Sequence, residues 1–340
     1  MTNSSPLPRK SNKLRRTVSI IGTGSYVPER VLTNFDLEKM VDTSDAWIRT
    51  RTGISERRIA AKEEATSDLA TKAALAAMEQ AQVTAEEIDL IIVSTVTPDM
   101  AFPATACWVQ KNLDAVRAAC FDISAACSGF VYALEIAQQF ISTHVYNTVL
   151  IIGADKLSSI VDWSDRNTCV LFGDGAGAAI LRNRADSHGV IATYMGSDGE
   201  FTDILCMPGG GSRTPITPEN INQKLNTIKM VGKETYKQAV IAMSTAADKV
   251  LELAGLTSQD ITCVIPHQAN IRIIEAIAHR MGIPMDKFYV SLERYGNTSA
   301  GAVAIALDEA HRTDRIKIGD YILLIVFGGG LTWASSIIQW

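Results

Sequence analysis

The sequence TKAALAAMEQAQVTAEEIDLIIV, residues 71–93, indicates the plan of the fold because its pattern returns later in the chain. Residues 71–81 are rich in helix formers, and residues 90–93 form a short apolar run typical of a buried strand. Residues 246–265, AADKVLELAGLTSQDITCVI, repeat the order of helix, polar connection and apolar run. This internal repeat predicts two related halves.

The repeat continues toward the end of each half. Cys127-Ser128-Gly129-Phe130-Val131 opens one predicted helix, and Ser299-Ala300-Gly301-Ala302-Val303 opens another. Each helix is followed by an apolar strand that ends in glycine, at residues 149–153 and 322–328, and then by a second apolar strand. Continuous apolar strands that alternate with helices predict an α/β protein whose sheets are buried on both faces.

The length of 340 residues allows two moderate halves with substantial cores. We predict a first half over residues 17–185, which holds a nucleophile, and a second half over residues 186–340. Residues 1–16 are polar and basic and contain no acidic residue, which indicates a disordered basic tail. A transit peptide is the alternative interpretation of that segment.

Composition limits the partners and the location. The net charge of −5 gives no electrostatic argument for nucleic acid, and no apolar run approaches the roughly 20 residues of a membrane span. The six cysteines form no C-x-x-C pair, which favours a reducing cytoplasm. The five histidines lie near no cluster of cysteines or carboxylates, so we expect no metal site.

Cys127 is the first candidate for chemistry. It lies in FDISAACSGF, residues 121–130, where a predicted strand gives way to a predicted helix. The positive end of the helix dipole stabilises a thiolate, which is the nucleophilic form of cysteine. We therefore expect an activated thiol, with a small buried hydrophobic residue as the alternative.

Two later segments bring polar side chains to similar places. Pro266-His267-Gln268-Ala269-Asn270 follows the predicted strand 263–265, and Tyr295-Gly296-Asn297-Thr298-Ser299 precedes a predicted helix. Taken alone, the first is typical of a structural histidine and the second of a helix cap. Together with a cysteine at a helix tip, they predict a site made of Cys127, His267 and Asn297.

These segments and the terminal run FGGGLTW, residues 327–333, resemble ketoacyl synthase III, the 3-oxoacyl-(acyl carrier protein) synthase that starts fatty acid biosynthesis. The resemblance covers about residues 17–340. It implies a thiolase-like fold, with two pseudo-symmetric halves in a five-layered αβαβα arrangement, and a homodimer. The implied activity is that of an acyltransferase that condenses a short acyl-CoA, with acetyl-CoA as the expected primer, with malonyl-acyl carrier protein.

The resemblance also implies the catalytic roles. Cys127 would attack the acyl-CoA thioester, and the backbone N–H groups of Cys127 and Gly330 would form the oxyanion hole. His267 and Asn297 would stabilise the enolate that remains after malonate loses carbon dioxide. Because decarboxylation supplies the carbanion, the reaction needs no metal or other cofactor, and the coenzyme A thioester is a substrate.

Further resemblances concern coenzyme A. Trp47 and Arg166 would stack on the two faces of adenine, which suits an indole and a guanidinium group. Arg51 would contact coenzyme A, and Gly232 and Asn270 would line the tunnel for its pantetheine arm.

The remaining resemblances concern the carrier protein and the primer. Lys237, Arg272 and Arg280 would meet the acidic carrier protein at the tunnel mouth. His279, next to Arg280, replaces a residue that is often lysine in the family. Phe102 would close the acyl pocket of the dimer partner, and its bulk would favour a short primer.

Three other functions are weighed against this one. A specialised condensing enzyme for a polyketide, quinolone or branched-chain primer shares the motifs, and its acyl-CoA preference would distinguish it. A NAD-binding role for Ile21–Pro28 is disfavoured, because the third glycine is missing and Pro28 interrupts the required helix. A non-catalytic scaffold would have no reason to keep Cys127, His267 and Asn297.

Overall fold

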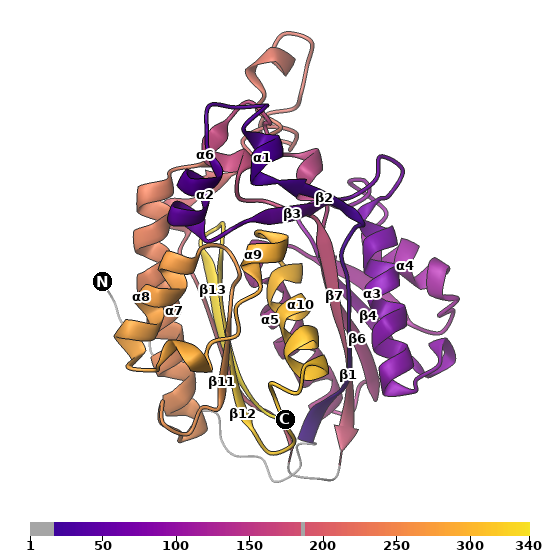
Figure 1. Ribbon diagram of the computed structural model, residues 1–340. Helices are drawn as coiled ribbons and strands as arrows, with labels where there is room; N and C mark the ends of the chain where they lie inside the picture. The colour runs from indigo at the N-terminus through magenta and orange to yellow at the C-terminus, as the bar shows by residue number, and fades with distance from the viewer. Residues whose placement is uncertain (1–16, 185–187) are drawn as a thin grey trace.

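The structure is a computed structural model that describes residues 17–184 and 188–340 (Figure 1). The basic segment at residues 1–16 lies outside the described residues, as does the boundary between the two predicted halves at residues 185 and 186. Among the helices of the described residues, none combines the length and apolar character needed to cross a membrane.

Two β-sheets and three helical layers stack in the order helix, sheet, helix, sheet, helix (Figure 1). The first sheet has the strand order β1-β7-β6-β4-β5, and the second has the order β11-β12-β13-β8. The strands of the first sheet are β1 (Thr17–Tyr26), β7 (Gly175–Arg184), β6 (Thr148–Asp155), β4 (Leu90–Ser94) and β5 (Ala119–Ile123). Those of the second are β11 (Cys263–Pro266), β12 (Tyr321–Gly328), β13 (Thr332–Gln339) and β8 (Gly189–Ser197).

The helical layers cover the outer faces of both sheets and fill the space between them (Figure 1). Outside the first sheet lie α3 (Thr66–Ala81) and α4 (Thr105–Leu113), and outside the second lie α7 (Gly232–Ala254) and α8 (Ile271–Met281). The central layer is formed by α5 (Gly129–Ser142) and α10 (Gly301–Arg312). The α/β class and the five-layered arrangement that we expected are confirmed.

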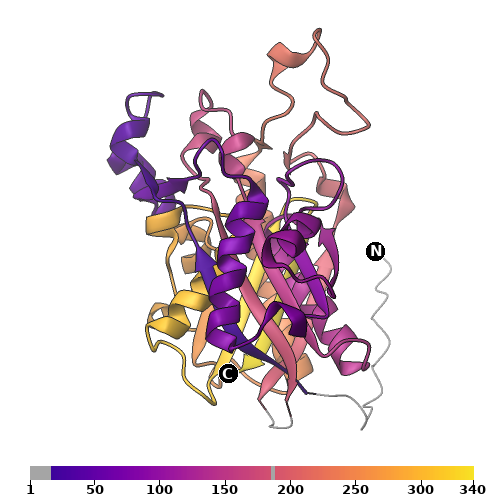
Figure 2. The same cartoon turned by 90° about the vertical axis from the view of Figure 1, so that its right-hand side faces the viewer.

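Shorter elements cap one end of these layers (Figure 1). They are β2 (Arg30–Thr33), β3 (Glu56–Ile59), α1 (Asn34–Leu37), α2 (Asp45–Thr52), α6 (Arg166–Cys169) and α9 (Leu292–Tyr295). Residues 207–228, between β9 (Leu205–Cys206) and β10 (Lys229–Met230), form a loop that protrudes beyond the layers (Figure 2). The Lys224 ammonium group ties this loop to the body through Asp162 Oδ1 at 2.8 Å.

The two sheets share one connection plan. β4 runs parallel to β6, and β6–β7 and β7–β1 are antiparallel; likewise β11 runs parallel to β12, and β12–β13 and β13–β8 are antiparallel. In the first sheet β5 pairs with β4. At the corresponding position of the second sheet, an isolated β-bridge joins Val264 of β11 to Phe288. The last strand of the first sheet ends at Arg184, and the chain enters the second sheet at Gly189. This change of sheet agrees with the predicted halves 17–185 and 186–340. The exact boundary between the halves stays a prediction.

The central helices are buried because they are apolar around almost their whole circumference. In α10, residues 301–308 are all buried, and in α5 the ring of Phe130 is fully buried. Full burial of one such ring contributes about 1.5–3 kcal/mol to stability. The N-terminal ends of both helices therefore lie at the centre of the molecule, where the two sheets face each other.

Candidate active site

Cys127 lies at the buried tip of α5, in the 3-10 turn Ala126–Ser128. Its side chain is only 7% exposed. The Ser128 hydroxyl donates to the carbonyl of Thr332 at 3.0 Å, and the Thr332 hydroxyl donates to the carbonyl of Ala125 at 2.9 Å. Both bonds tie the helix tip to β13, so the second half of the fold fixes the position of the cysteine.

The resting state of Cys127 differs from our expectation. Burial is the main cause that raises the pKa of the thiol to about 12, and the charge of Asp155 acts in the same direction. Hydrogen bonds from Ser299, Asn297 and the backbone N–H of Cys127 lower it, but by less. Desolvation therefore opposes the thiolate that we expected the helix end to stabilise. The raised pKa favours the thiol form of Cys127 in the protein without substrate.

His267 follows the last residue of β11 and is almost fully buried. Its backbone N–H donates to the carbonyl of Ile325 at 2.8 Å, and no described residue forms a hydrogen bond with its Nδ1 atom. Burial lowers the pKa of His267 to about 4, so the imidazole is neutral near pH 7. The Gln268 side chain fixes the loop, since its amide group donates to the Pro266 carbonyl at 2.8 Å and accepts from the Ser291 N–H at 2.8 Å.

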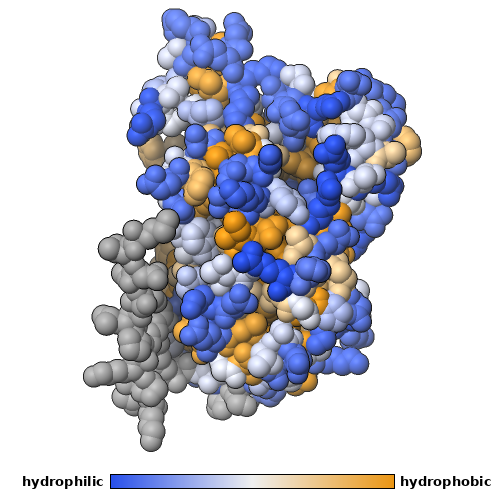
Figure 3. Space-filling model, turned by 90° about the vertical axis from the view of Figure 1, so that its left-hand side faces the viewer, coloured by the Kyte–Doolittle hydropathy of each residue, from blue (hydrophilic) through white to orange (hydrophobic). Residues whose placement is uncertain are grey.

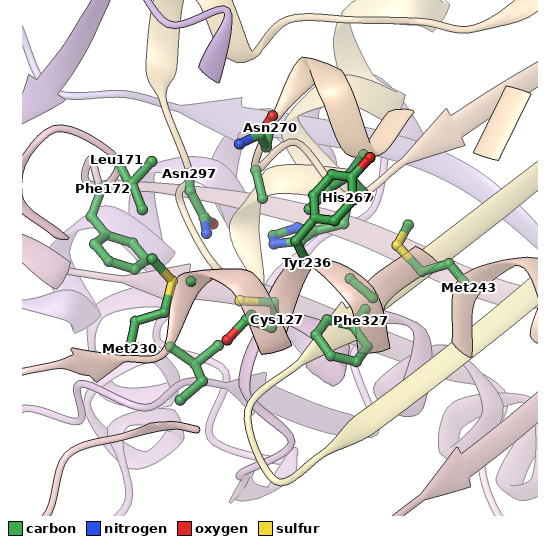
Figure 4. A pocket seen from close by; sticks show the side chains of 16 residues that line it. Cys127, Leu171, Phe172, Met230, Tyr236, Met243, His267, Asn270, Asn297 and Phe327 are labelled. Atoms are coloured by element: carbon green, nitrogen blue, oxygen red, sulfur yellow. The ribbon is translucent and has the colours of Figure 1, made fainter. Parts of the chain in front are cut away.

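Asn297 lies in the turn before α10, where its backbone N–H donates to the Leu171 carbonyl at 2.8 Å. Its Oδ1 atom accepts the N–H of Ser299 at 2.8 Å, which leaves the amide NH2 group free to act as a donor. The side chains of Cys127, His267 and Asn297 point toward one common space (Figure 4). The three residues predicted from separate motifs are thus brought together.

That space is a cavity of about 100 Å³. Gly232, at the start of α7, and Asn270, which caps α8, line it as we expected for the tunnel. The remaining wall is largely apolar and consists of Leu171, Phe172, Leu205, Met230, Thr235, Tyr236, Ala239, Met243, Ala269, Ile273 and Phe327. Gly232 has only Met230 Cε within 4 Å of a Cβ placed on it, so the backbone borders open space there.

A second cavity of about 130 Å³ lies on the other side of Cys127, and its walls are mostly apolar. The sequence motifs did not identify these walls, because they come from eight separate segments without a shared pattern. They are Val96, Ala126, Leu157, Ile160, Phe172, Leu205, Cys206, Met207, Ile228, Ser299 and Gly329. The backbone N–H of Ile228 donates to the carbonyl of Ile160 at 2.9 Å and links two of these walls.

The structure corrects the glycine expected in the oxyanion hole. Gly330 is exposed and lines neither cavity, whereas Gly329 lines the second cavity beside Cys127. No described residue accepts a hydrogen bond from the Gly329 N–H. The physical reason is that β12 meets the Cys127 backbone at Gly328, so the next residue, Gly329, lines the second cavity with Cys127, whereas Gly330 is exposed.

The residues expected at adenine lie together at the capped end of the molecule. The guanidinium carbon of Arg166 lies 5.0 Å from the ring centroid of Trp47, and that of Arg51 lies 5.7 Å from it. Arg166 also donates to the backbone carbonyl of Asp42 at 2.6 Å. Because Arg166 already stacks on the indole, it must swing away before a purine can enter between them.

The three residues expected to meet the carrier protein are exposed on α7 and α8, the face shown in Figure 3, where hydrophilic side chains surround a smaller hydrophobic patch. Lys237 follows the cavity-lining Tyr236 in α7, and the Tyr236 hydroxyl lies 3.5 Å from the backbone carbonyl oxygen of Arg272, although neither Lys237 nor Arg272 lines the first cavity. Arg280 lies eight residues beyond Arg272 on α8, about 12 Å farther along the helix axis. The structure therefore separates Arg280 from the other two.

Phe102 lies in the loop before α4 and is 84% exposed. It lines neither cavity of its own chain, which leaves its expected role with a partner untested. Within the described residues no group of three or more His, Cys, Asp and Glu side chains could hold a metal ion. All six cysteines are free thiols.

Comparisons with known proteins agree with this geometry. A family model described as 3-oxoacyl-[acyl-carrier-protein (ACP)] synthase III matches residues 121–199, and the model of its C terminal matches residues 251–340. The beta-ketoacyl-[acyl-carrier-protein] synthase III of Caldanaerobacter subterraneus subsp. tengcongensis is 59% identical over 321 residues, which is 94% of this chain and 97% of the relative.

Two solved structures are similar over almost their whole length. The 3-oxoacyl-[acyl-carrier-protein] synthase III from Aquifex aeolicus VF5 is 49% identical with a TM-score of 0.89, over 95% of this chain and all of the other (100%). The priming beta-ketosynthase from the R1128 polyketide biosynthetic pathway is 35% identical with a TM-score of 0.89, over 98% of this chain and 99% of the other. The chain therefore belongs to the 3-oxoacyl-(acyl carrier protein) synthase III family.

Proposed function

We propose that this protein condenses a short acyl-CoA with malonyl-acyl carrier protein and releases carbon dioxide, which gives 3-oxoacyl-acyl carrier protein and initiates fatty acid biosynthesis. The observation that carries the proposal is the cavity in which Cys127 meets His267 and Asn297. The names of the relatives, which are beta-ketoacyl-acyl carrier protein synthases III at up to 59% identity, support the same acyltransferase reaction.

In the first half-reaction, the Cys127 sulfur attacks the carbonyl carbon of the acyl-CoA thioester, and coenzyme A leaves as its thiolate. The negative charge of the tetrahedral intermediate needs preorganised donors. The backbone N–H groups of Cys127 and Gly329 are the proposed pair, because both border the second cavity and the Gly329 N–H has no partner among the described residues.

In the second half-reaction, malonyl-acyl carrier protein loses carbon dioxide and becomes an enolate. The neutral imidazole of His267 and the NH2 group of Asn297 would donate to its thioester oxygen. The enolate carbon attacks the acyl group on Cys127, and the cysteine leaves as a thiolate. Since decarboxylation supplies the carbanion, we propose that the coenzyme A thioester enters only as substrate and that the chemistry calls for no metal or redox cofactor.

The binding surfaces follow from the two cavities. The pantetheine arm would pass Gly232 and Asn270 in the first cavity, and the adenine would bind between Trp47 and Arg166, with Arg51 nearby. The acidic carrier protein would dock on α7 and α8 through the exposed side chains of Lys237 and Arg272, with a smaller contribution from Arg280.

The second cavity would hold the acyl group of the primer. Its volume of about 130 Å³ suits a short chain, for which acetyl is the proposed primer. We further propose a homodimer that forms along β5, the edge strand of the first sheet. The exposed side chains of Phe102 and Val116 lie near that edge, and Phe102 would close the pocket of the partner.

A specialised priming enzyme is the second candidate. The observation that favours it is the similarity to the R1128 priming beta-ketosynthase at 35% identity, which covers 98% of this chain. A preference for primers longer or more branched than acetyl would support this candidate. For either function we propose a location in the cytoplasm, which agrees with the six free thiols.

The proposed function is tested by the mass of the intact protein after mixing with a panel of acyl-CoA thioesters. We expect a gain of one acyl group, largest for acetyl, that is absent from Cys127→Ala. No adduct from any thioester would contradict the proposal, and an adduct retained in Cys127→Ala would contradict the assigned nucleophile. A preference for a long or branched acyl group would replace the first candidate with the second.

A further inference from the structure

Arg57, in β3, is a buried cation that lines neither cavity. Its side chain is 0% exposed, whereas its neighbour Arg58, on the other face of the strand, is partly exposed. Burial lowers the pKa of Arg57 to about 10, so the guanidinium group is still charged near pH 7. Because a buried charge is costly unless it is bonded, the partners of this group indicate what it does.

The guanidinium group of Arg57 donates to three neutral oxygen atoms. Its Nη1 atom donates to the backbone carbonyl of Leu32 at 3.2 Å and to Oδ1 of Asn34 at 2.9 Å. Its Nη2 atom donates to the backbone carbonyl of Val170 at 2.7 Å, although Val170 is 113 residues away in the sequence. The two nitrogen atoms of one planar fork thus join the strands of the cap to the end of α6.

Asn34 connects Arg57 to the proposed adenine site. The side chain of Asn34 is fully buried, and its Nδ2 atom donates to Oδ1 of Asp45 at 2.9 Å and to the carbonyl of Ile54 at 2.8 Å. Asp45 is the first residue of α2, the helix that carries Trp47. Asn34 therefore holds the start of this helix through its NH2 group while its oxygen accepts from Arg57.

The Val170 carbonyl connects Arg57 to the other wall of the same site. Val170 directly follows α6, whose first residue is Arg166. The guanidinium carbon of Arg166 lies 5.0 Å from the ring centroid of Trp47, and α2 and α6 lie side by side at the capped end of the molecule (Figure 1). Arg57 thus reaches one helix of the adenine site through Asn34 and the other through Val170.

The segment after Val170 also connects Arg57 to Asn297. The Asn297 N–H donates to the Leu171 carbonyl at 2.8 Å, and the Gly173 N–H donates to the Asn297 carbonyl at 3.0 Å. Arg57 packs against this segment as well, because a Cβ placed on Gly173 would lie 3.0 Å from the Cβ of Arg57. Arg57 therefore holds the segment that fixes the backbone of Asn297 on both sides.

We propose that Arg57 is a positioning residue that fixes the proposed adenine site and Asn297 relative to each other. It touches no substrate and acts through Asn34 and through the Val170 carbonyl. The proposal rests on the proposed function, because it uses the roles given there to adenine stacking and to the Asn297 donor. It adds that one buried guanidinium group serves both the binding of acyl-CoA and the condensation step.

Arg57→Lys tests the proposal, because it keeps a positive charge but replaces two donor nitrogen atoms by one. We expect the acyl-CoA concentration that half-saturates acylation of Cys127 to rise about tenfold, and condensation by the acylated protein to slow about tenfold, since small misplacements of positioned groups are costly. The half-saturating concentration of the corresponding acyl-pantetheine, which lacks adenine, should stay unchanged. Single-turnover mass measurements of each half-reaction give these values.

This pattern separates a positioning role from a purely structural one. A general loss of stability lowers the fraction of folded protein, and with it the amplitude of both half-reactions, but does not change a half-saturating concentration for one donor alone. Unchanged saturation by acyl-CoA together with an unchanged rate of condensation in Arg57→Lys would overturn the proposal. Equal rises for acyl-CoA and acyl-pantetheine would also overturn it.

Asn34→Ala tests the two connections separately. It removes the bond to Asp45 but leaves the bond from Arg57 to Val170, so we expect weaker saturation by acyl-CoA with a normal rate of condensation. In the double variant with Arg57→Lys, the rise for acyl-CoA should not exceed that of Arg57→Lys alone, because both changes break one connection. Additive rises would overturn the proposal. Thermal unfolding checks that Arg57→Lys is folded; if it is not, unchanged acyl-CoA saturation in Asn34→Ala overturns the proposal.

Arg58→Lys is the matched control on the same strand. The Arg58 side chain donates to the Pro28 carbonyl at 3.4 Å and lies 3.7 Å from a carboxylate oxygen of Glu56. We expect its acylation and condensation to be those of the unmodified protein, and a defect equal to that of Arg57→Lys would overturn the proposal. Failure of the proposed function is distinguishable, because the unmodified protein would then form no acyl adduct at all.

Discussion

Gly328, at the end of β12, lies so close to Cys127 that a Cβ placed on it would come within 2.6 Å of the cysteine backbone nitrogen. This contact joins the two halves of the fold at the reacting residue. The same relation recurs with the halves exchanged, because a Cβ on Gly153 would collide with the backbone carbonyl oxygen of Ala300. Glycine stands at the end of β12 (Gly328) and two residues before the end of β6 (Gly153), because each position abuts the helix tip contributed by the other half.

Gly328→Ala should therefore disturb the nucleophile directly. The added methyl group meets backbone atoms that cannot give way, so we expect a loss of stability of about 1–3 kcal/mol and much slower acylation of Cys127. Urea unfolding and acyl-adduct mass measure the two effects. Gly255→Ala is the control, because its Cβ would meet nothing within 4 Å, although its φ of 69° costs stability; it should leave acylation unchanged. Normal acylation in Gly328→Ala would show that the contact does not position the sulfur.

Asn297→Ala should separate the two half-reactions. Asn297 supplies a donor to the enolate, and removal of such a donor typically costs about 100- to 1,000-fold in rate. We expect condensation to slow by that factor, while acylation of Cys127 continues. Single-turnover mass measurements with acyl-CoA alone, and then with malonyl-acyl carrier protein, distinguish the steps. A block in acylation would show that the assigned role is wrong.

The free energy of unfolding should depend on pH in a way that reveals the buried, neutral imidazole of His267. Burial lowers the pKa of His267 from 6.5 to about 4. Between these values the unfolded chain binds a proton that the folded chain does not, so this group makes the free energy of unfolding fall as the pH falls from 6.5 to 4. We expect His267→Gln to lose stability less steeply over that range in urea titrations. An unchanged slope would mean that the imidazole is not neutral and buried as described.

The proposed adenine site predicts that loss of Trp47 weakens the binding of acyl-CoA but not of an acyl donor that lacks adenine. Trp47→Ala should raise the KM for acyl-CoA by about ten- to a hundredfold, because stacking on an aromatic ring contributes about 1–3 kcal/mol per base. The KM for the corresponding acyl-pantetheine, which lacks adenine, should stay unchanged and serves as the control. Steady-state kinetics with both donors measures this difference, and equal losses for both donors would place Trp47 outside the adenine site.

The size of the second cavity predicts the primer range. Ile228→Ala removes part of its wall and should shift the preference toward longer acyl groups, since Ile228 is buried and lies against Ile160. Acyl-adduct mass across a chain-length series is the measurement. An unchanged preference would indicate that the acyl group lies elsewhere.

Much of this protein could be predicted from local sequence. The repeat of residues 71–93 at 246–265 gave the two related sheets, since hydrophobic periodicity records which faces are buried. The ends of strands and the starts of helices carried Cys127, His267 and Asn297, and polar residues at such positions point to a shared cleft. Their identities and chain order were sufficient to predict a Cys/His/Asn site.

Tertiary structure alone decided the rest. The raised pKa of Cys127 and the lowered pKa of His267 depend mainly on desolvation by segments remote in sequence, which no local pattern records. Gly329 rather than Gly330 lines the second cavity with Cys127 because of where β12 meets the turn before α5. Ser299 was visible only as part of a helix cap, and it comes to line the second cavity with Cys127 when the two halves pack. Local sequence thus determined which groups are present, and packing between the halves determined their charge and their neighbours.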